Sequence, residues 1–227
     1  MALNVIFPRL CVVCGNSIES DWGCNNICAI CASKILWLPA KQVPNIISSC
    51  KLGLWSFGFV KQLFGSGQIC FEHAGVGRNL ILALKYGNCE FLVKDIVYLI
   101  RKKRPDIMEY LAHSILVPVP LSYRKRVLRD YNQSLLIANE LAKYADDAHV
   151  ENLLCSKYHR SQTSLSPKER ILNAKNSFFA RKSEKNHNKH LVVIDDVMTT
   201  GATLAACCSA LFDQGFINVD VLTLSHG

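Results

Sequence analysis

Two carboxylates stand side by side near the end of the chain, where Asp195 and Asp196 follow the apolar run Leu191–Ile194. Three of those four apolar residues are β-branched, which is typical of a buried strand in a parallel sheet. We expect the two carboxylates to end this strand. Ionised carboxylates accept hydrogen bonds, so a neighbouring pair can bind the vicinal hydroxyls of a sugar.

A hydroxyl-rich turn follows the carboxylates and leads into a helical pattern. The turn contains Thr199, Thr200, Gly201 and Thr203. The unpaired backbone N–H groups at a helix N-terminus attract a phosphate, and threonine hydroxyls can donate to phosphate oxygens. With a further strand predicted over 219–224, the segment forms a strand–turn–helix–strand unit whose turn can hold a phosphate.

A ribose 5-phosphate fits this unit, with its phosphate on the turn and its 2′- and 3′-hydroxyls on the carboxylates. The stretch Leu191–Thr203 also resembles, at every position, the phosphoribosyl pyrophosphate (PRPP) motif of type I phosphoribosyltransferases. The contacts that this resemblance implies involve Asp195, Asp196, Val197, Met198, Thr199, Thr200, Gly201, Ala202 and Thr203. An ordinary helix cap is an alternative, but a cap needs no carboxylates. Receiver domains also pair aspartates to hold magnesium, although early in the chain, and the Walker sequence GxxxxGK[ST] is absent here.

Four cysteines near the N-terminus have the spacing of a structural zinc site. They form two CxxC pairs separated by 13 residues: Cys11, Cys14, Cys28 and Cys31. Two such pairs supply four thiolates and close a tetrahedral site, whereas a redox CxxC normally occurs as a single pair. Cys24 could replace one of the four ligands, and we expect Trp22 and Trp37 to pack over the cluster.

The composition is that of a globular protein with room for one core and a small appendage. The chain has 227 residues, of which 50% are hydrophobic and 19% charged, and its net charge is +8. The positive charge favours a polyanionic partner. No apolar run reaches the length of a membrane span, and the N-terminus does not resemble a signal peptide. Eleven cysteines without an export signal favour metal ligands and buried thiols, so we expect a cytoplasmic protein.

Basic residues occur at three further places. Lys85 ends a helix predicted over 78–85, and the cluster at 101–104 is expected to be a solvated helix end, with nucleic-acid contact as the alternative. A buried strand predicted over 115–120 precedes a basic loop that could hold pyrophosphate or nucleic acid. Its candidate residues are Tyr123, Arg124, Lys125, Arg126, Arg129 and Tyr131. Residues 159–178 are expected to form a mobile flap followed by a short helix, and we expect His73 to be a structural histidine.

Together these segments resemble the ComF family of bacterial competence proteins. The resemblance rests on the cysteine pairs, on Leu84–Gly87, on Val117–Leu121 and on Asp195–Thr203; it also rests on Arg129 with Asn132 and Gln133, and on Gln162, Leu165, Arg170, Asn173 and Phe178. It implies an α/β fold with a type I phosphoribosyltransferase-like parallel sheet, flanking helices and a small N-terminal zinc ribbon. We place the ribbon at 1–44 and the phosphoribosyltransferase-like domain at 45–227. Where the family has glycine and phenylalanine, this chain has Asp130 and Tyr131.

The resemblance implies a role in DNA uptake during natural transformation, beside a helicase and recombination mediators. A first hypothesis is an enzyme that uses PRPP with Mg²⁺, in which Asp195, Asp196, Arg129 and Lys85 are catalytic and the acceptor is unassigned. Such reactions pass through an oxocarbenium-like ribose, so stabilising the leaving pyrophosphate carries most of the rate. A second hypothesis is a module that binds single-stranded DNA, and a third is an adaptor that docks a helicase through the ribbon. We expect one structural zinc and no membrane partner.

Overall fold

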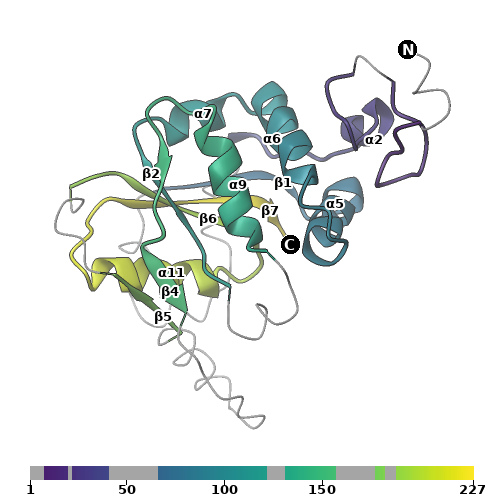
Figure 1. Cartoon of the computed structure of the whole chain (residues 1–227). Coiled ribbons are helices and arrows are strands. Elements are labelled where there is room, and N and C mark those ends of the chain that lie inside the picture. The colour runs from purple at the N-terminus through teal and green to yellow at the C-terminus, as the bar shows by residue number, and fades with distance from the viewer. Residues whose placement is uncertain (1–7, 20–21, 41–65, 122–130, 157–176, 182–187) are drawn as a thin grey trace, which may run out of the picture.

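The computed structural model describes residues 8–19, 22–40, 66–121, 131–156, 177–181 and 188–227. Its centre is a five-stranded, wholly parallel sheet (Figure 1). The strands lie in the order β1 (Gly67–Glu72), β7 (Val219–His226), β6 (Leu191–Met198), β2 (Ile115–Pro118) and β3 (His149–Val150). A separate antiparallel pair consists of β4 (Leu154–Ser156) and β5 (Phe178–Ala180). The predicted α/β class with a parallel sheet is confirmed.

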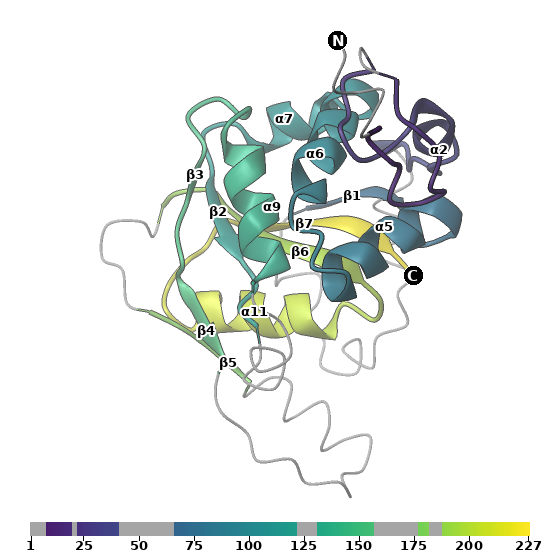
Figure 2. The ribbon, with the colours of Figure 1, turned by 45° about the vertical axis from the view of Figure 1, so that its right-hand side comes forward.

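Helices cover both faces of the sheet (Figure 2). One side carries α5 (Gly75–Tyr86), α6 (Leu92–Lys103), α7 (Asp106–Leu111) and α9 (Gln133–Ala142), and the other carries α11 (Ala202–Phe212) with the β4–β5 pair. The short helix α2 (Ala29–Ser33) belongs to the cysteine-rich N-terminal segment. Because helices bury both faces, the central strands are continuously apolar, as the sequence of β6 predicts.

Alternate residues of the central strands enter two different cores. Leu116, Val192, Ile194 and Leu222 pack in the core that α5, α6 and α9 share with the N-terminal segment. The residues between them pack in the core beneath α11: Ile115, Val117, Leu191, Val193 and Val221. This alternation follows from the two-residue repeat of a strand.

The strand order creates a switch point between β2 and β6. From β2 the chain passes through α9 to β3 on one side, whereas β6, on the other side of β2, leads through α11 to β7. In open α/β sheets, ligands bind beyond the carboxyl ends of the strands at such a point. The turn after β6 and the segment after β2 both leave the sheet there, since Pro118 and Ile194 are paired in register.

The N-terminal segment is attached to the α/β body by buried polar contacts. The Asp95 carboxylate of α6 accepts hydrogen bonds from the backbone N–H groups of Asn25 (3.1 Å) and Asn26 (2.6 Å). Farther along, the Leu38 N–H donates to the Cys70 carbonyl of β1 at 3.0 Å. The ring of Trp37 lies edge-on to Phe71, with centroids 5.7 Å apart. The predicted division at residue 44 lies outside the described residues.

Several predicted boundaries and roles differ in the structure. Strand β6 continues through both aspartates to Met198, instead of ending at them, and α11 begins at Ala202. The prediction for Arg104 was wrong: its side chain is buried, and it donates to Asp106, to Gln68 and to the backbone carbonyls of Ile69 and Leu38. It therefore joins α6 to β1 and is neither a solvated helix end nor a contact for nucleic acid. None of the helices in the described residues has the length and apolar character that crossing a membrane requires.

Candidate functional site

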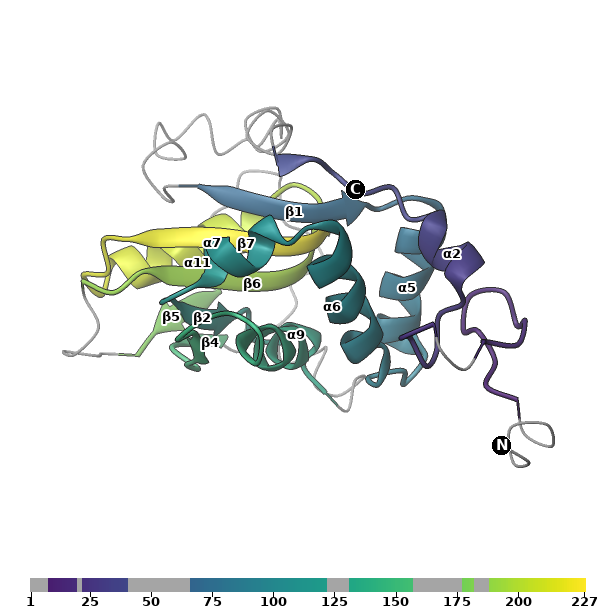
Figure 3. The same cartoon turned by 90° about the horizontal axis from the view of Figure 1, so that it is seen from above.

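The candidate site lies at the carboxyl edge of the sheet, beside α5 (Figure 3). Four elements bring side chains or backbone donors to this edge: the end of β6, the start of α11, the end of α5 and the start of α9. Tight packing holds α5 against the end of β1. A Cβ added at Gly77 would lie 2.8 Å from the Glu72 carbonyl oxygen and 2.9 Å from the Phe71 ring.

Asp195 lies in a largely dehydrated position beside α9. Its Oδ1 accepts hydrogen bonds from the Ser134 hydroxyl at 3.0 Å and from the Asp196 backbone N–H at 2.9 Å. Burial, together with the neighbouring charge of Asp196, raises the pKa of Asp195 to about 6, although both hydrogen bonds and Lys85 oppose the shift. Near neutral pH this carboxyl group can therefore gain or lose a proton in response to a ligand.

Asp196 is paired with a cation. The Nζ atom of Lys85 lies 3.0 Å from its Oδ1, and the two side chains are only 19% and 10% exposed. The structure thus brings together three of the four residues predicted to be catalytic: Asp195, Asp196 and Lys85. The carboxylate pair is not open in this state, because a ligand hydroxyl must compete with Lys85 for Asp196.

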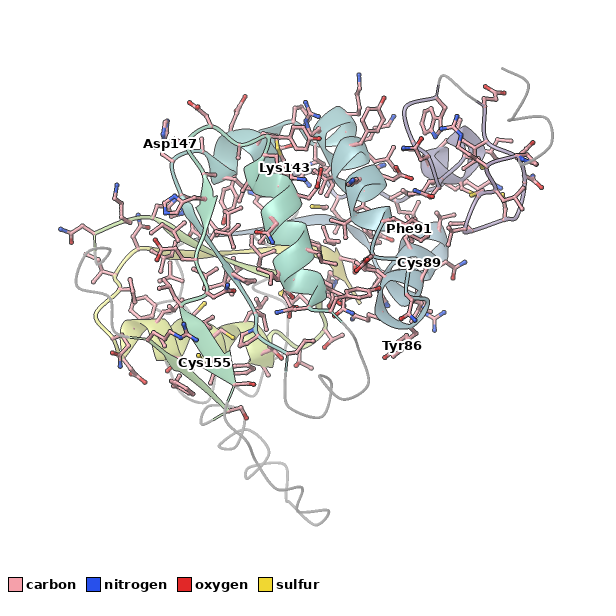
Figure 4. All side chains as sticks on the ribbon, in the orientation of Figure 1. Tyr86, Cys89, Phe91, Lys143, Asp147 and Cys155 are labelled. Atoms are coloured by element: carbon pink, nitrogen blue, oxygen red, sulfur yellow. The ribbon has the colours of Figure 1, made fainter. Side chains whose placement is uncertain are left out.

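The end of α5 is held in place by residues of the α9 start. The Tyr131 hydroxyl donates to the Leu84 carbonyl oxygen at 2.7 Å, and the Gln133 side-chain amide lies 3.4 Å from the same oxygen. Asn132 caps α9 through the Ser134 N–H (3.1 Å). The ring of Tyr131, a predicted nucleic-acid contact, is half-buried, whereas Tyr86, at the end of α5, projects outward (Figure 4).

The turn between β6 and α11 leaves the start of α11 exposed. Gly201 is the N-cap of α11 and has a positive φ of 70°, a conformation that glycine adopts without strain. Thr199, Thr200 and Thr203 are exposed. The Thr200 hydroxyl accepts a long hydrogen bond of 3.5 Å from the Ala202 N–H. The helix N-terminus is therefore accessible from the carboxyl edge of the sheet.

The other predicted loop residues lie outside the described residues: Tyr123, Arg124, Lys125, Arg126 and Arg129, as well as most of the predicted flap. On either side of this loop, Leu121 follows β2 and Tyr131 precedes α9. These predictions stay predictions.

The sequence did not indicate that His73 is a neighbour of the site. His73 follows β1, and its Nδ1 lies 3.1 Å from the Ser225 hydroxyl of β7. Burial and the nearby charges of Lys85 and Arg78 lower the pKa of His73, while Asp196 acts in the opposite direction. His73 is thus both structural, as predicted, and electrostatically linked to the candidate site. No spacing in the sequence indicates this link, because it depends on how α5 folds across the strand ends.

The four cysteines of the N-terminal pairs converge as predicted. The Sγ atoms of Cys11, Cys14, Cys28 and Cys31 all lie within 4.8 Å of one another, and those of Cys14 and Cys28 are 3.7 Å apart. A tetrahedral zinc with Zn–S bonds of 2.3 Å requires sulfur atoms about 3.8 Å apart, so the donor set fits zinc. Cys24, left open as a substitute ligand, instead faces α6, where its Sγ lies 4.0 Å from the Asp95 carbonyl oxygen.

No protein-family model matches the chain. Among curated proteins, it is 31% identical over 113 residues to Competence protein F of Haemophilus influenzae, covering 49% of each chain. It is 32% identical over 110 residues to the DNA utilization protein YhgH of Escherichia coli O157:H7, covering 48% of each. The identity to Competence protein ComFC of Bacillus subtilis is 31% over 103 residues, which is 45% of this chain and 40% of that protein. The chain spans about half the length of the curated relatives it matches, and over that part it is similar to proteins named for competence and for DNA utilization.

Proposed function

We propose that the protein acts in the uptake or utilization of DNA, in the cytoplasm, and that its carboxyl-edge site binds PRPP or a related ribose 5-phosphate compound. The names of the relatives support the first part. The observation that carries the second is the joint position of Asp195, Asp196 and an accessible, glycine-capped helix N-terminus at the switch point of the sheet.

Each group of the site has a distinct part in this proposal. The N–H groups at the start of α11 and the threonine hydroxyls bind the 5-phosphate, and the two aspartates accept hydrogen bonds from the ribose hydroxyls. When bound, Mg²⁺ would neutralise the pyrophosphate and be held with it by the aspartate oxygens. Lys85, with Arg129 of the basic loop, stabilises the negative charge on the departing pyrophosphate. In an enzyme these interactions would support transfer of the ribosyl phosphate to an acceptor.

A DNA-binding role is the second candidate and is compatible with the first. The net charge of +8 and the basic residues of the loop after β2 favour contact with a phosphate backbone. An adaptor role for the zinc ribbon, in docking a helicase, is a third candidate, which the resemblance to the ComF family implies.

Replacing Asp195 or Asp196 with Asn tests the sugar site. We expect each variant to lose ~1–3 kcal/mol of binding free energy for PRPP with Mg²⁺, because an amide accepts weaker hydrogen bonds than a carboxylate. Isothermal titration calorimetry measures the loss. Asp213→Asn, at the exposed end of α11, is the matched control. Unchanged affinity in both test variants would contradict the sugar-site proposal.

The pH dependence of PRPP binding tests Asp195 separately. Only the ionised carboxylate is a full acceptor, so protonation at a pKa of about 6 should weaken binding by about tenfold per pH unit below that value. The wild type is compared with Asp195→Asn, in which this contribution is absent and only the titration of the ligand and other groups remains. Parallel pH profiles for the two proteins would show that Asp195 does not contact the ligand. The raised pKa of Asp195 also affects folding stability, with the opposite dependence on pH. Because the folded state holds this proton more tightly than the unfolded chain, raising the pH from about 4 to 6 lowers the free energy of unfolding.

Removal of the metal tests the zinc ribbon. We expect one zinc per chain in the wild type and in Cys89→Ser, and loss of zinc in Cys14→Ser, because only Cys14 belongs to the sulfur cluster. Elemental analysis measures the metal, and thermal unfolding should show a lower Tm after chelation, since the ribbon shares a core with α5 and α6. A stoichiometric zinc content in Cys14→Ser would contradict the four-cysteine site.

Salt dependence tests the DNA-binding role. We expect the affinity for single-stranded oligonucleotides to fall with rising salt, with a log–log slope of roughly −0.7 per phosphate contacted. Replacing Arg124, Lys125 and Arg126 together with Ala should make the slope less steep. Lys94→Ala, at an exposed position on α6, is the control for loss of positive charge. Fluorescence anisotropy provides the affinities, and a salt-independent affinity would rule out backbone binding.

A further inference from the structure

The two carboxylate oxygens of Asp195 have different surroundings. Its Oδ1 accepts hydrogen bonds from the Ser134 hydroxyl at 3.0 Å and from the Asp196 backbone N–H at 2.9 Å. A carboxylate oxygen has about two acceptor sites, so these two donors occupy Oδ1. Within the part of the chain that the structure describes, no donor contacts Oδ2. Because Asp195 is only half-buried, Oδ2 keeps its acceptor capacity for a ligand.

Asp196 is held in another way. It is buried, and its Oδ1 lies 3.0 Å from the Lys85 Nζ atom. A ligand hydroxyl at this carboxylate has to displace the ammonium group or share the carboxylate with it. The Ser134 hydroxyl carries no charge and contacts only Oδ1 of Asp195, so it does not compete for Oδ2. Asp195 is therefore the aspartate whose ligand-facing oxygen is oriented in advance.

Ser134 is itself held in place by the start of α9. Asn132 is the N-cap of this helix: its Oδ1 accepts the Ser134 N–H at 3.1 Å, and its Nδ2 donates to the Val119 carbonyl oxygen at 3.1 Å, just beyond β2. The Tyr131 hydroxyl donates to the Leu84 carbonyl oxygen of α5 at 2.7 Å, which fixes the helix start from a second side. The buried Ser134 hydroxyl thus reaches from the helix after β2 to a carboxylate of β6, across the switch point of the sheet.

We propose that Ser134 is a positioning residue of the sugar site: by holding Oδ1 of Asp195, it presents Oδ2 to a ribose hydroxyl. Serine suits this role because its hydroxyl donates one hydrogen bond without adding a charge. It fixes the rotation of the carboxylate and leaves its negative charge to act on the ligand. This inference rests on the proposed function, because it assumes that the sugar binds at the two aspartates.

A double-mutant cycle tests whether Ser134 acts through Asp195. We expect Ser134→Ala to weaken the binding of PRPP with Mg²⁺ by roughly three- to tenfold, because the carboxylate loses the donor that fixes its rotation. In an Asp195→Ala background, the same substitution should change the affinity by less than about twofold, since the hydroxyl has no carboxylate to hold. Isothermal titration calorimetry measures the four affinities. Equal losses in the two backgrounds would overturn the proposal.

Two further variants separate positioning from a purely structural role. Ser134→Thr keeps the hydroxyl and should bind PRPP within about twofold of the wild type. Ser114→Ala is the matched control, because the buried Ser114 hydroxyl donates to the Leu111 carbonyl oxygen at 2.6 Å, at the amino end of β2 and away from the site. We expect this control to lower the Tm and to leave the PRPP affinity unchanged.

The combined outcomes distinguish this inference from the proposed function. If Ser134→Ala lowers the Tm as the control does and leaves the PRPP affinity unchanged, Ser134 only supports the fold and the proposal is overturned. Asp195→Ala would still weaken binding in that case, so the sugar site itself would stand. If the wild type does not bind PRPP, the proposed function fails, and this inference fails with it.

Discussion

Two adjacent carboxylates lie within the buried strand β6, and the structure accommodates them in two different ways. Asp195 is stabilised in its protonated form by burial and by the charge of Asp196, while Asp196 stays paired with Lys85. Desolvating two like charges side by side would otherwise be costly. Contacts of α5 place the Lys85 ammonium group on the Asp196 carboxylate. The helix lies close to β1 at Gly77, and Tyr131 donates a hydrogen bond to the carbonyl oxygen of Leu84.

The cysteine-rich segment contributes to the same placement, although it lies away from the aspartates. Its Cys11, Cys28 and Cys31 side chains belong to the core that contains α5 and α6, and its backbone binds the Asp95 carboxylate of α6. A buried carboxylate that accepts several backbone hydrogen bonds fixes the orientation of its partners. The cysteine-rich segment and the α/β body therefore share one core, and a metal held by the four cysteines would support the helices beside the candidate site.

The sequence was sufficient where local spacing determines the result, and insufficient where chain segments meet only in the fold. Local spacing alone predicts a buried strand before Asp195, a turn and helix start around Gly201, and a sulfur cluster from the paired cysteines. The structure contains all three features. Arg104 looked like the last member of a surface cluster, yet its side chain is buried. Its five acceptor atoms are the two carboxylate oxygens of Asp106, the side-chain oxygen of Gln68 and the backbone carbonyl oxygens of Ile69 and Leu38. His73 could not be linked to Lys85 from the sequence, since only the path of α5 brings them near each other.

The pairing of Lys85 with Asp196 also determines how the proposed ligand must act on the site. A sugar hydroxyl is a neutral donor and is a poor replacement for an ammonium ion on a partly buried carboxylate. A ligand hydroxyl that reaches Asp196 therefore has to displace the Lys85 ammonium or share the carboxylate with it. The proposed sugar site therefore depends on what the Lys85 side chain pairs with once Asp196 is occupied by a ligand.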